Sequence, residues 1–549
     1  MFRSGIETAI QNALKDMGAE DVVFVVERPS DMAHGDYATN VALAAAKILK
    51  KNPRDVAAEL QSKLENSAGV EKTQVAGAGF INFYLSHDAL TTTVKEAAED
   101  SWGKGNTYAG KKVLVEYTSP NLFKPLHIGN LIGNILGESI ARLFEASGAD
   151  VKRLNYPSDI GLTIAKGVWG LQKHNLNPEN IAELGKAYVL GNEAYESSEA
   201  KEQIEEINRA LYAGSNAEWS TLREKGIATS LKHLHELCVR LGTKGFDKEF
   251  FESQSGVLGQ KIVSDNIGSV FEVSDGATVY HGEHTRVFLN SQGLPTYEAK
   301  EVGLFELKSN AYPNFDISIT VTGKEQTDFF RIVFEAIRKV FPGKTNGKDL
   351  LHVPTSFLKL TTGKMSSRLG NVITGESLLA EVTEAARGRE DVAVGALKYT
   401  VLKQGSGKDI VFDPEKSLSL EGDSGPYVQY ALVRARSLLR QAKDARMENA
   451  ADGGRSRPLG QALPSASILL RRSLVHFPDV VARAAGELEP HHVVTYLTEL
   501  AAAFNSWYAA ERLIVDGTVS ADALALVQAV EHTLHCGLDV LGIPSPEEM

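Results

Sequence analysis

The chain has 549 residues, of which 43% are hydrophobic and 23% charged, and its formal net charge is -12 at pH 7. This hydrophobic content excludes a disordered or collagen-like chain, and the length suggests about three or four domains. Two cysteines, Cys238 and Cys536, are too few for a disulfide framework or a cysteine-rich zinc site, which favours a reducing cytoplasm. The acidic balance argues against nonspecific coating of nucleic acid, although local basic surfaces can still bind RNA.

The first block, residues 1–109, is predicted to be a small α+β domain. A helix opens it, residues 21–26 form a strand, residues 37–51 form a helix, and residues 70–86 form a pair of strands. The polar, glycine-containing run at 100–111 is predicted to link it to the next block. The opening helix lacks the continuous apolar core of a signal peptide, and no stretch approaches the ~18 apolar residues of a membrane span.

The second block, residues 110–390, is predicted to be an α/β domain. A buried strand at 111–117 is followed by a loop, by a helix at 129–148 with helical apolar spacing, and by a strand at 151–156. Strand, helix and strand in this order form one unit of a parallel sheet. The charged, helical pattern at 170–250 indicates an insertion into that sheet.

The third block, residues 391–549, has an almost entirely helical pattern. A polar stretch at 448–467 is predicted to be a loop between two of its helices. This block is therefore expected to be an all-α domain.

The motif PLHIGNLIG, at 125–133, lies between the first strand of the predicted sheet and its helix. Ligands of open α/β sheets bind at this edge, where the strands end. Gly129 lets the backbone approach a phosphate, and the helix N-terminus offers unpaired N–H groups. His127 can donate a hydrogen bond to charge that develops on the phosphate. Taken alone, the motif is equally compatible with an ordinary loop.

A second motif, TTGKMSSRLGN at 361–371, brings two cations and two hydroxyls together on a glycine-flanked loop. Such a loop suits the binding of a triphosphate and the later release of pyrophosphate. A solvated basic turn is the alternative when this motif stands alone.

Together and in this order, the two motifs resemble the two signature sequences of class I aminoacyl-tRNA synthetases. Other segments are similar to the arginyl-tRNA synthetase family, namely VEYTSPNLFKPLHIGN, GLPTYEAKEVGL, VTGKEQTDFF, SGPYVQYALVRARSLLR, GDYATNVAL, GAGFINFYLS, AFNSWY and the terminal LGIPSPEEM. The resemblance implies an α/β fold with a Rossmann-like parallel-sheet catalytic domain. It also implies an α+β N-terminal domain that binds the tRNA elbow and an all-α anticodon-binding domain.

The resemblance implies that ATP activates L-arginine as arginyl-adenylate, which is then transferred to the 3′ end of tRNA(Arg). His127 and Lys364 match the catalytic positions, where they would stabilise phosphate charge in the transition state. The implied ATP-binding residues are His127, Gly129, Asn130, Lys364, Ser366 and Arg368. Mg²⁺ would arrive with ATP rather than in a protein cage, and no protein-bound zinc is expected.

A guanidinium is recognised by oxygens arranged to accept a fork of hydrogen bonds, which the compact ammonium of lysine cannot fill. The family resemblance assigns this pocket, with the amino-group contacts, to Glu116, Ser119, Asn121, Asn130, Tyr297, Glu301 and Gln326. Without it, Tyr297 and Glu301 would be interpreted as residues of an exposed, charged helix. The family usually has His in place of Asn130 and Asp in place of Glu301.

Aromatic side chains can stack on unpaired RNA bases. The resemblance assigns tRNA contacts to Phe80 and Asn82 at the elbow, and to Tyr427, Tyr430, Arg434, Ala503, Trp507 and Met549 at the anticodon loop. Burial in a helix-bundle core is the alternative for Tyr430 and Trp507.

Three functions remain in competition: an arginine–tRNA ligase, a class I synthetase for another amino acid, and a synthetase-like RNA-binding protein without catalysis. The first is favoured because the resemblance covers all three blocks. We expect a cytoplasmic monomer whose partners are tRNA(Arg), L-arginine and ATP, with no membrane partner. The segment HLHELC, at 233–238, is interpreted as a surface helix rather than a metal site.

Overall fold

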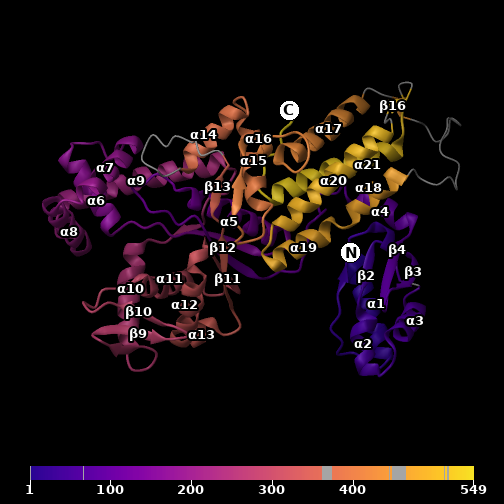
Figure 1. The fold of residues 1–549 in the computed structure, drawn as a ribbon, viewed down its shortest axis with the longest axis horizontal. Coiled ribbons are helices and arrows are strands. Elements are labelled where there is room, and N and C mark those ends of the chain that lie inside the picture. Colours follow the sequence, from indigo (N-terminus) through magenta and orange to yellow (C-terminus); the bar gives the residue numbers. More distant parts are fainter. Residues whose placement is uncertain are drawn as a thin grey trace.

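The computed structural model describes residues 2–549 except for Asn66, 362–373, 444–445, 448–464, 512–513 and 516–517. Along the chain, an α+β unit is followed by a parallel-sheet unit and by a helical unit (Figure 1). This arrangement confirms the predicted fold class. No helix in the described ranges is long and apolar enough to cross a membrane, and the predicted loop at 448–467 falls mainly outside these ranges.

The N-terminal unit packs helices on an antiparallel sheet of order β1-β2-β4-β3. Its elements are α1 (Phe2–Asp16), β1 (Val26–Glu27), η1 (Met32–His34), β2 (Tyr37–Thr39), α2 (Val41–Leu49), α3 (Pro53–Leu64), β3 (Val70–Ala76), β4 (Phe80–Leu85) and α4 (His87–Glu96). The strand pair predicted at 70–86 is confirmed. The helix predicted to begin at residue 37 begins at Val41, because Tyr37–Thr39 pair instead with β4.

The central sheet has the order β12-β11-β5-β6-β7, and each neighbouring pair is parallel. Its strands are β5 (Lys112–Glu116), β6 (Asp150–Asn155), β7 (Lys248–Glu249), β11 (Ile317–Gly323) and β12 (Asp349–Thr355). Helix α5 (Ile128–Ala146) connects β5 to β6. The predicted strand–helix–strand unit is therefore confirmed. The central place of β5 explains its continuous apolar run, since both faces of such a strand are buried.

Two groups of elements are inserted between strands of this sheet, one of helices alone and one of helices and strands (Figure 1). The first comprises α6 (Leu162–Lys173), α7 (Ile181–Ala194), α8 (Ser198–Ala213) and α9 (Ala217–Arg240), so it begins before the predicted residue 170. The second comprises α10 (Glu252–Asp265), β8 (Glu272–Ser274), β9 (Ala277–His281), β10 (Thr285–Leu289), α11 (Tyr297–Ala311), η2 (Lys324–Gln326), α12 (Thr327–Val340) and α13 (Pro342–Thr345), interrupted by β11.

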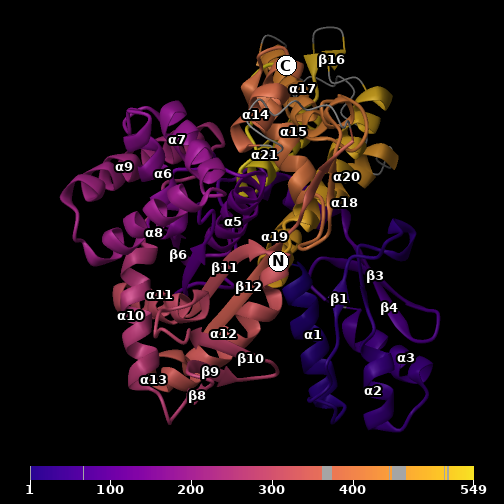
Figure 2. The same ribbon diagram turned by 60° about the vertical axis from the view of Figure 1, so that its left-hand side comes forward.

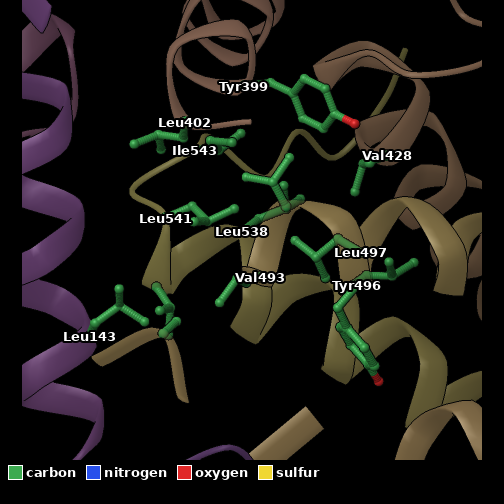
Figure 3. Packing of buried hydrophobic residues seen from close by; sticks show 14 of the residues in the cluster. Leu143, Tyr399, Leu402, Val428, Val493, Tyr496, Leu497, Leu538, Leu541 and Ile543 are labelled. Carbon is green, nitrogen blue, oxygen red and sulfur yellow. The ribbon is translucent and has the colours of Figure 1, made fainter. Parts of the chain in front are cut away.

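The remaining elements form a small strand pair and the C-terminal helices. They are β13 (Leu358–Leu360), α14 (Gly375–Ala385), α15 (Glu390–Leu402), β14 (Ile410–Phe412), α16 (Pro414–Ser417), α17 (Gly425–Lys443), β15 (Arg446–Met447), α18 (Ser465–Val475), α19 (Phe477–Glu487), α20 (His491–Ala510), β16 (Ile514–Val515), β17 (Thr518–Val519) and α21 (Ala521–Val540). Leu143 of α5 belongs to the same buried cluster as Tyr399, Leu497 and Leu538 of these helices (Figure 3). The central sheet and the C-terminal helices thus share one core.

The N-terminal unit is attached to the C-terminal helices by polar contacts. The Tyr37 hydroxyl donates to Asp479 of α19 at 2.8 Å, and Arg472 of α18 binds the buried Asp36 at 2.5 Å. Helix α4 lies beside α18 (Figure 1), and Figure 2 shows the rest of the N-terminal unit below α18. These contacts fix the N-terminal unit at one end of the helical unit.

Helices α10 and α11 approach each other through paired glycines. A Cβ at Gly259 would lie 1.9 Å from the carbonyl oxygen of Ala299, and a Cβ at Gly303 would lie 2.0 Å from that of Ser255. Neither contact can be relieved by turning a side chain, because both involve backbone. The position of α11 against α10 therefore requires glycine at both places.

We expect Gly259→Ala to lower the free energy of unfolding by about 1–3 kcal/mol, because the helices must move apart. Thermal unfolding followed by circular dichroism measures the change. Gly5→Ala is the matched control, because that glycine also lies inside a helix and its added Cβ meets nothing within 4 Å. The control should gain about 0.5–1 kcal/mol from helix propensity. Equal midpoints for the two variants would contradict the assigned contact.

Candidate active site

The candidate site lies at the carboxyl edge of the parallel sheet. Helix α5 follows β5, and α11 precedes β11, so both helices begin at this edge. The loop after β5 and the 3₁₀ turn after β11 meet there as well. The sequence-predicted residues of the first signature and of the arginine site come from these segments, and this edge is where open α/β sheets bind ligands.

His127 is the N-cap residue of α5. Its Nδ1 accepts a hydrogen bond from the backbone N–H of Gly129 at 3.1 Å, and its side chain is exposed. In the neutral ring the hydrogen must therefore reside on Nε2, which is left to donate to a ligand. With the unpaired N–H groups of the helix start, this donor forms a site suited to phosphate.

The residues that follow the second signature in the chain contact the first signature. Lys364, Ser366 and Arg368 lie outside the described residues. Thr374, the first described residue after them, pairs with His127 across a backbone bridge, and the Gly375 N–H donates to the Leu126 carbonyl at 2.8 Å. Thr374 and Gly375 thus lie against the histidine motif.

Three carboxylates and two lysines form the candidate arginine pocket. Lys308 Nζ donates to the buried Glu116 at 2.9 Å, and Lys300 forms an ion pair with the buried Glu252. Glu301 has no hydrogen-bond or ion-pair partner among the described residues. The cluster therefore holds one carboxyl group without a partner among the described residues, which is the arrangement a single guanidinium would complete.

The environment of Glu301 disfavours its charged form. Burial and the charges of Glu116 and Glu252 raise the pKa of Glu301 to about 8, although Lys308 opposes the shift. Burial and the charge of Glu301 likewise raise the pKa of Tyr156, whose hydroxyl is hydrogen-bonded to the Ser255 hydroxyl at 2.5 Å. A bound cation would reverse the shift at Glu301.

The other predicted arginine-site residues take different positions. Tyr297, the first residue of α11, is 73% exposed, and Lys300 Nζ lies 5.1 Å from the centre of its ring. Asn121 is exposed after β5, and Gln326 is exposed after β11. The Ser119 Oγ is buried without a hydrogen-bond partner among the described residues. The side-chain amide of Asn130 donates to the Thr118 carbonyl at 2.8 Å.

Sequence reasoning missed Tyr156, Glu252, Lys300 and Lys308. Lys300 and Lys308 are on the same helix as Glu301, in a run of alternating charges typical of an exposed surface. The sequence nevertheless contained one indication that Lys308 belongs to the site. Glu301 and Lys308 are seven residues apart on the same helix and therefore share one of its faces.

The predicted anticodon-loop residues divide into accessible and buried groups. The Arg434 guanidinium lies over the rings of Tyr430, at 4.8 Å, and of Tyr508, at 5.1 Å. The same guanidinium donates to Asn505 at 2.6 Å, and Asn505 donates to the Tyr427 hydroxyl at 3.2 Å. Tyr508 is 41% exposed and was not predicted. This cluster on α17 and α20 presents aromatic faces and a cation together.

Trp507 takes the position of its alternative interpretation, burial in the core of the helix bundle. Its side chain is 1% exposed and stacks on Phe504, so its ring is not accessible in this structure. Ala503, one turn earlier, is half-buried, and Met549 ends the chain directly after a carbonyl held by Arg389 at 2.6 Å.

The two predicted elbow residues lie on one face of β4. Phe80 is 38% exposed and offers a ring to RNA. Asn82 is 4% exposed, so it has little surface for a direct contact. Within the described ranges no cluster of three or more His, Cys, Asp or Glu side chains is arranged to hold a metal, and His233 instead bonds Glu376 at 2.8 Å.

Family models match three successive parts of the chain. The model for "tRNA synthetases class I (R), catalytic domain" matches residues 97–413. That for "Arginyl tRNA synthetase N terminal domain" matches residues 4–85, and that for "DALR anticodon binding domain" matches residues 428–549.

Relatives and solved structures agree over the whole chain. The chain is 29% identical to the arginine–tRNA ligase of Clostridium acetobutylicum over 98% of both chains, and 28% identical to that of Halothermothrix orenii over 100% of both. The Thermus thermophilus arginyl-tRNA synthetase superposes with a TM-score of 0.82 at 29% identity, covering 100% of each chain. Because the catalytic-domain model alone spans more than half of the residues, the chain belongs to the arginyl-tRNA synthetase family of class I aminoacyl-tRNA synthetases.

Proposed function

We propose that this enzyme activates L-arginine with ATP and transfers the arginyl group to the 3′ end of tRNA(Arg), releasing AMP and pyrophosphate. The observation that carries the choice of amino acid is the single unpaired carboxylate of Glu301. The other two carboxylates of its pocket are each paired with a lysine. A planar guanidinium satisfies both oxygens of Glu301, whereas an ammonium satisfies them less completely.

The chemical step needs positioning and charge stabilisation rather than a covalent protein intermediate. The arginine carboxylate attacks the α-phosphorus of ATP, which enters with Mg²⁺ as part of the substrate, and the bond to pyrophosphate breaks. His127 Nε2 and Lys364 are assigned to the charge that develops on the phosphates, with Gly129, Ser366 and Arg368 around them. Glu116, Ser119, Asn121, Tyr297 and Gln326 are assigned to arginine.

Transfer requires the tRNA to reach this edge while its anticodon is held elsewhere. The Tyr430–Arg434–Tyr508 cluster suits the stacking of unpaired bases, and Phe80 suits a contact at the elbow. Local contacts of this kind are compatible with the net charge of -12. We further infer domain boundaries near residues 109 and 390, a cytoplasmic location and a monomeric enzyme.

ATP–pyrophosphate exchange with each amino acid, with and without tRNA, separates the competing functions. Exchange that depends on arginine and on added tRNA supports the proposed ligase. Exchange driven by another amino acid would replace arginine as the substrate, and no exchange under any condition would indicate a protein without catalysis.

We expect the KM for arginine to fall about tenfold per pH unit as the pH rises from 6 towards 8. Below the raised pKa of about 8 the empty site holds a neutral Glu301, so arginine must first displace a proton. Steady-state exchange at constant ionic strength measures the profile, with the KM for ATP as an internal control. In Glu301→Gln the slope should vanish and arginine should bind more weakly at pH 8. An unchanged slope in this variant would assign the titration to another group.

Lys364→Ala and His127→Ala should each lower the rate of arginine activation by about 100-fold to 1,000-fold, as expected for loss of one preorganised donor. Filter binding should give a tRNA affinity within about threefold of wild type, since neither residue is assigned to RNA. Equal losses in activation and in tRNA affinity would show that the phosphate assignment is wrong.

A further inference from the structure

The loop between β5 and α5 contains two successive left-handed residues that are not glycine. Thr118 has a φ of 77° and Ser119 a φ of 41°. A β-branched residue such as threonine is rarely found there, because its Cβ substituents crowd the backbone. Such outliers persist only where the surrounding structure holds them, and they concentrate at functional sites.

Side-chain amides from two directions hold this loop. On α5, Asn130 donates to the Thr118 carbonyl at 2.8 Å, and Asn134, one turn further, donates to the Thr118 hydroxyl at 3.0 Å. At the end of β6, the side-chain amide oxygen Oδ1 of Asn155 accepts a hydrogen bond from the backbone N–H of Ser119 at 3.2 Å. Thr118, Asn134 and Asn155 are all at least 96% buried, so water does not compete for these bonds.

The orientation of the Asn134 amide is itself fixed. Its oxygen accepts a hydrogen bond from the Thr243 hydroxyl at 2.6 Å, so its nitrogen must face Thr118. Asn134 can therefore act on Thr118 as a donor without rotating away.

The strained segment leads directly into the candidate arginine site. It connects Glu116, at the end of β5, with Asn121, and it buries the Ser119 hydroxyl without a partner among the described residues. A buried hydroxyl without a partner is costly unless a ligand completes its hydrogen bonding.

We propose that Asn134, assisted by Asn130, is a positioning residue that holds Thr118 and Ser119 in the left-handed conformation in which Ser119 and Asn121 receive the amino group of arginine. This inference rests on the proposed function. It also gives Asn130 a role that differs from a phosphate contact, because its donor is directed to the loop backbone.

The test is a rescue experiment on the strained residue. Asn134→Ala should raise the KM for arginine about tenfold, the effect of losing one buried hydrogen bond, while kcat and the KM for ATP change less than threefold. Adding Thr118→Gly should restore the KM for arginine to within about threefold of wild type, because glycine adopts a positive φ without steric cost. Thr118→Gly alone should have little effect.

Thr533→Val is the matched structural control. It removes a buried hydroxyl of α21 that accepts a hydrogen bond from Trp102 Nε1 at 2.9 Å and that touches neither Asn134 nor Thr118, so the thermal midpoint should fall while the KM for arginine stays within threefold. If Asn134→Ala does not fold, Asn130→Ala supplies the same test, because Thr118→Gly retains the carbonyl and should rescue it too.

The outcomes separate this inference from the function on which it rests. Wild-type exchange that does not depend on arginine would overturn both. Arginine-dependent wild-type exchange, with a double variant no better than the corresponding asparagine variant, would overturn the positioning role alone. A KM for arginine that rises equally in Thr533→Val would also overturn it, since the effect would then follow stability.

Discussion

The buried carboxylate of Glu138 is the constraint on which much of the structure depends. It is fully buried on α5 and accepts hydrogen bonds from Tyr117 at 2.8 Å, Arg142 at 2.7 Å and Arg153 at 2.9 Å. Burial alone would raise the pKa of Glu138, but the two arginines hold it below its ordinary value. A buried carboxylate is tolerated when it has these partners. If one partner is lost, the buried charge that remains is no longer compensated, and the fold is destabilised by several kcal/mol.

These partners connect parts of the molecule that are distant in sequence. Arg153 lies on β6, the strand next to β5, and Tyr117 follows β5 at the start of the strained loop. Arg142 also donates hydrogen bonds to Asp539 and to the Gly242 carbonyl. Asn130, Asn134, Glu138 and Arg142 follow each other at four-residue intervals, so they form one polar stripe along α5. At its far end, the buried Lys398 donates to the Gly542 carbonyl at 2.7 Å and fixes the C-terminal tail. The stripe thus orients the first signature with respect to the C-terminal helices.

The sequence predicts the regular parts of this fold because their periodicity reflects burial. The apolar run of β5 and the helical spacing of α5 were sufficient to place both within one or two residues. Residues 37–39 were wrongly assigned to a helix, because their strand conformation depends on pairing with a distant part of the chain. Trp507 shows the same limit, since an aromatic residue on a helix has identical local sequence whether it meets RNA or a core.

The arginine pocket was harder to predict because its charges compensate each other across elements. Glu301 was identified through resemblance, but its significance comes from Lys308 on Glu116 and Lys300 on Glu252. Neither ion pair can be inferred from helical spacing, since each joins α11 to a different element. Within α11 alone, the alternating charges have the pattern of a solvent-exposed helix.

The same pairing also explains how a pocket with three carboxylates can select one substrate charge. If all three were unpaired, their repulsion would favour proton uptake or a divalent ion over a guanidinium. The two internal lysines remove that excess and leave Glu301 to be neutralised by the ligand. The charge of Glu301 then determines that one cation binds, but it does not discriminate between arginine and lysine. That separation must come from geometry, in which the planar fork of the guanidinium meets both oxygens of a carboxylate held by the close contact of α10 and α11.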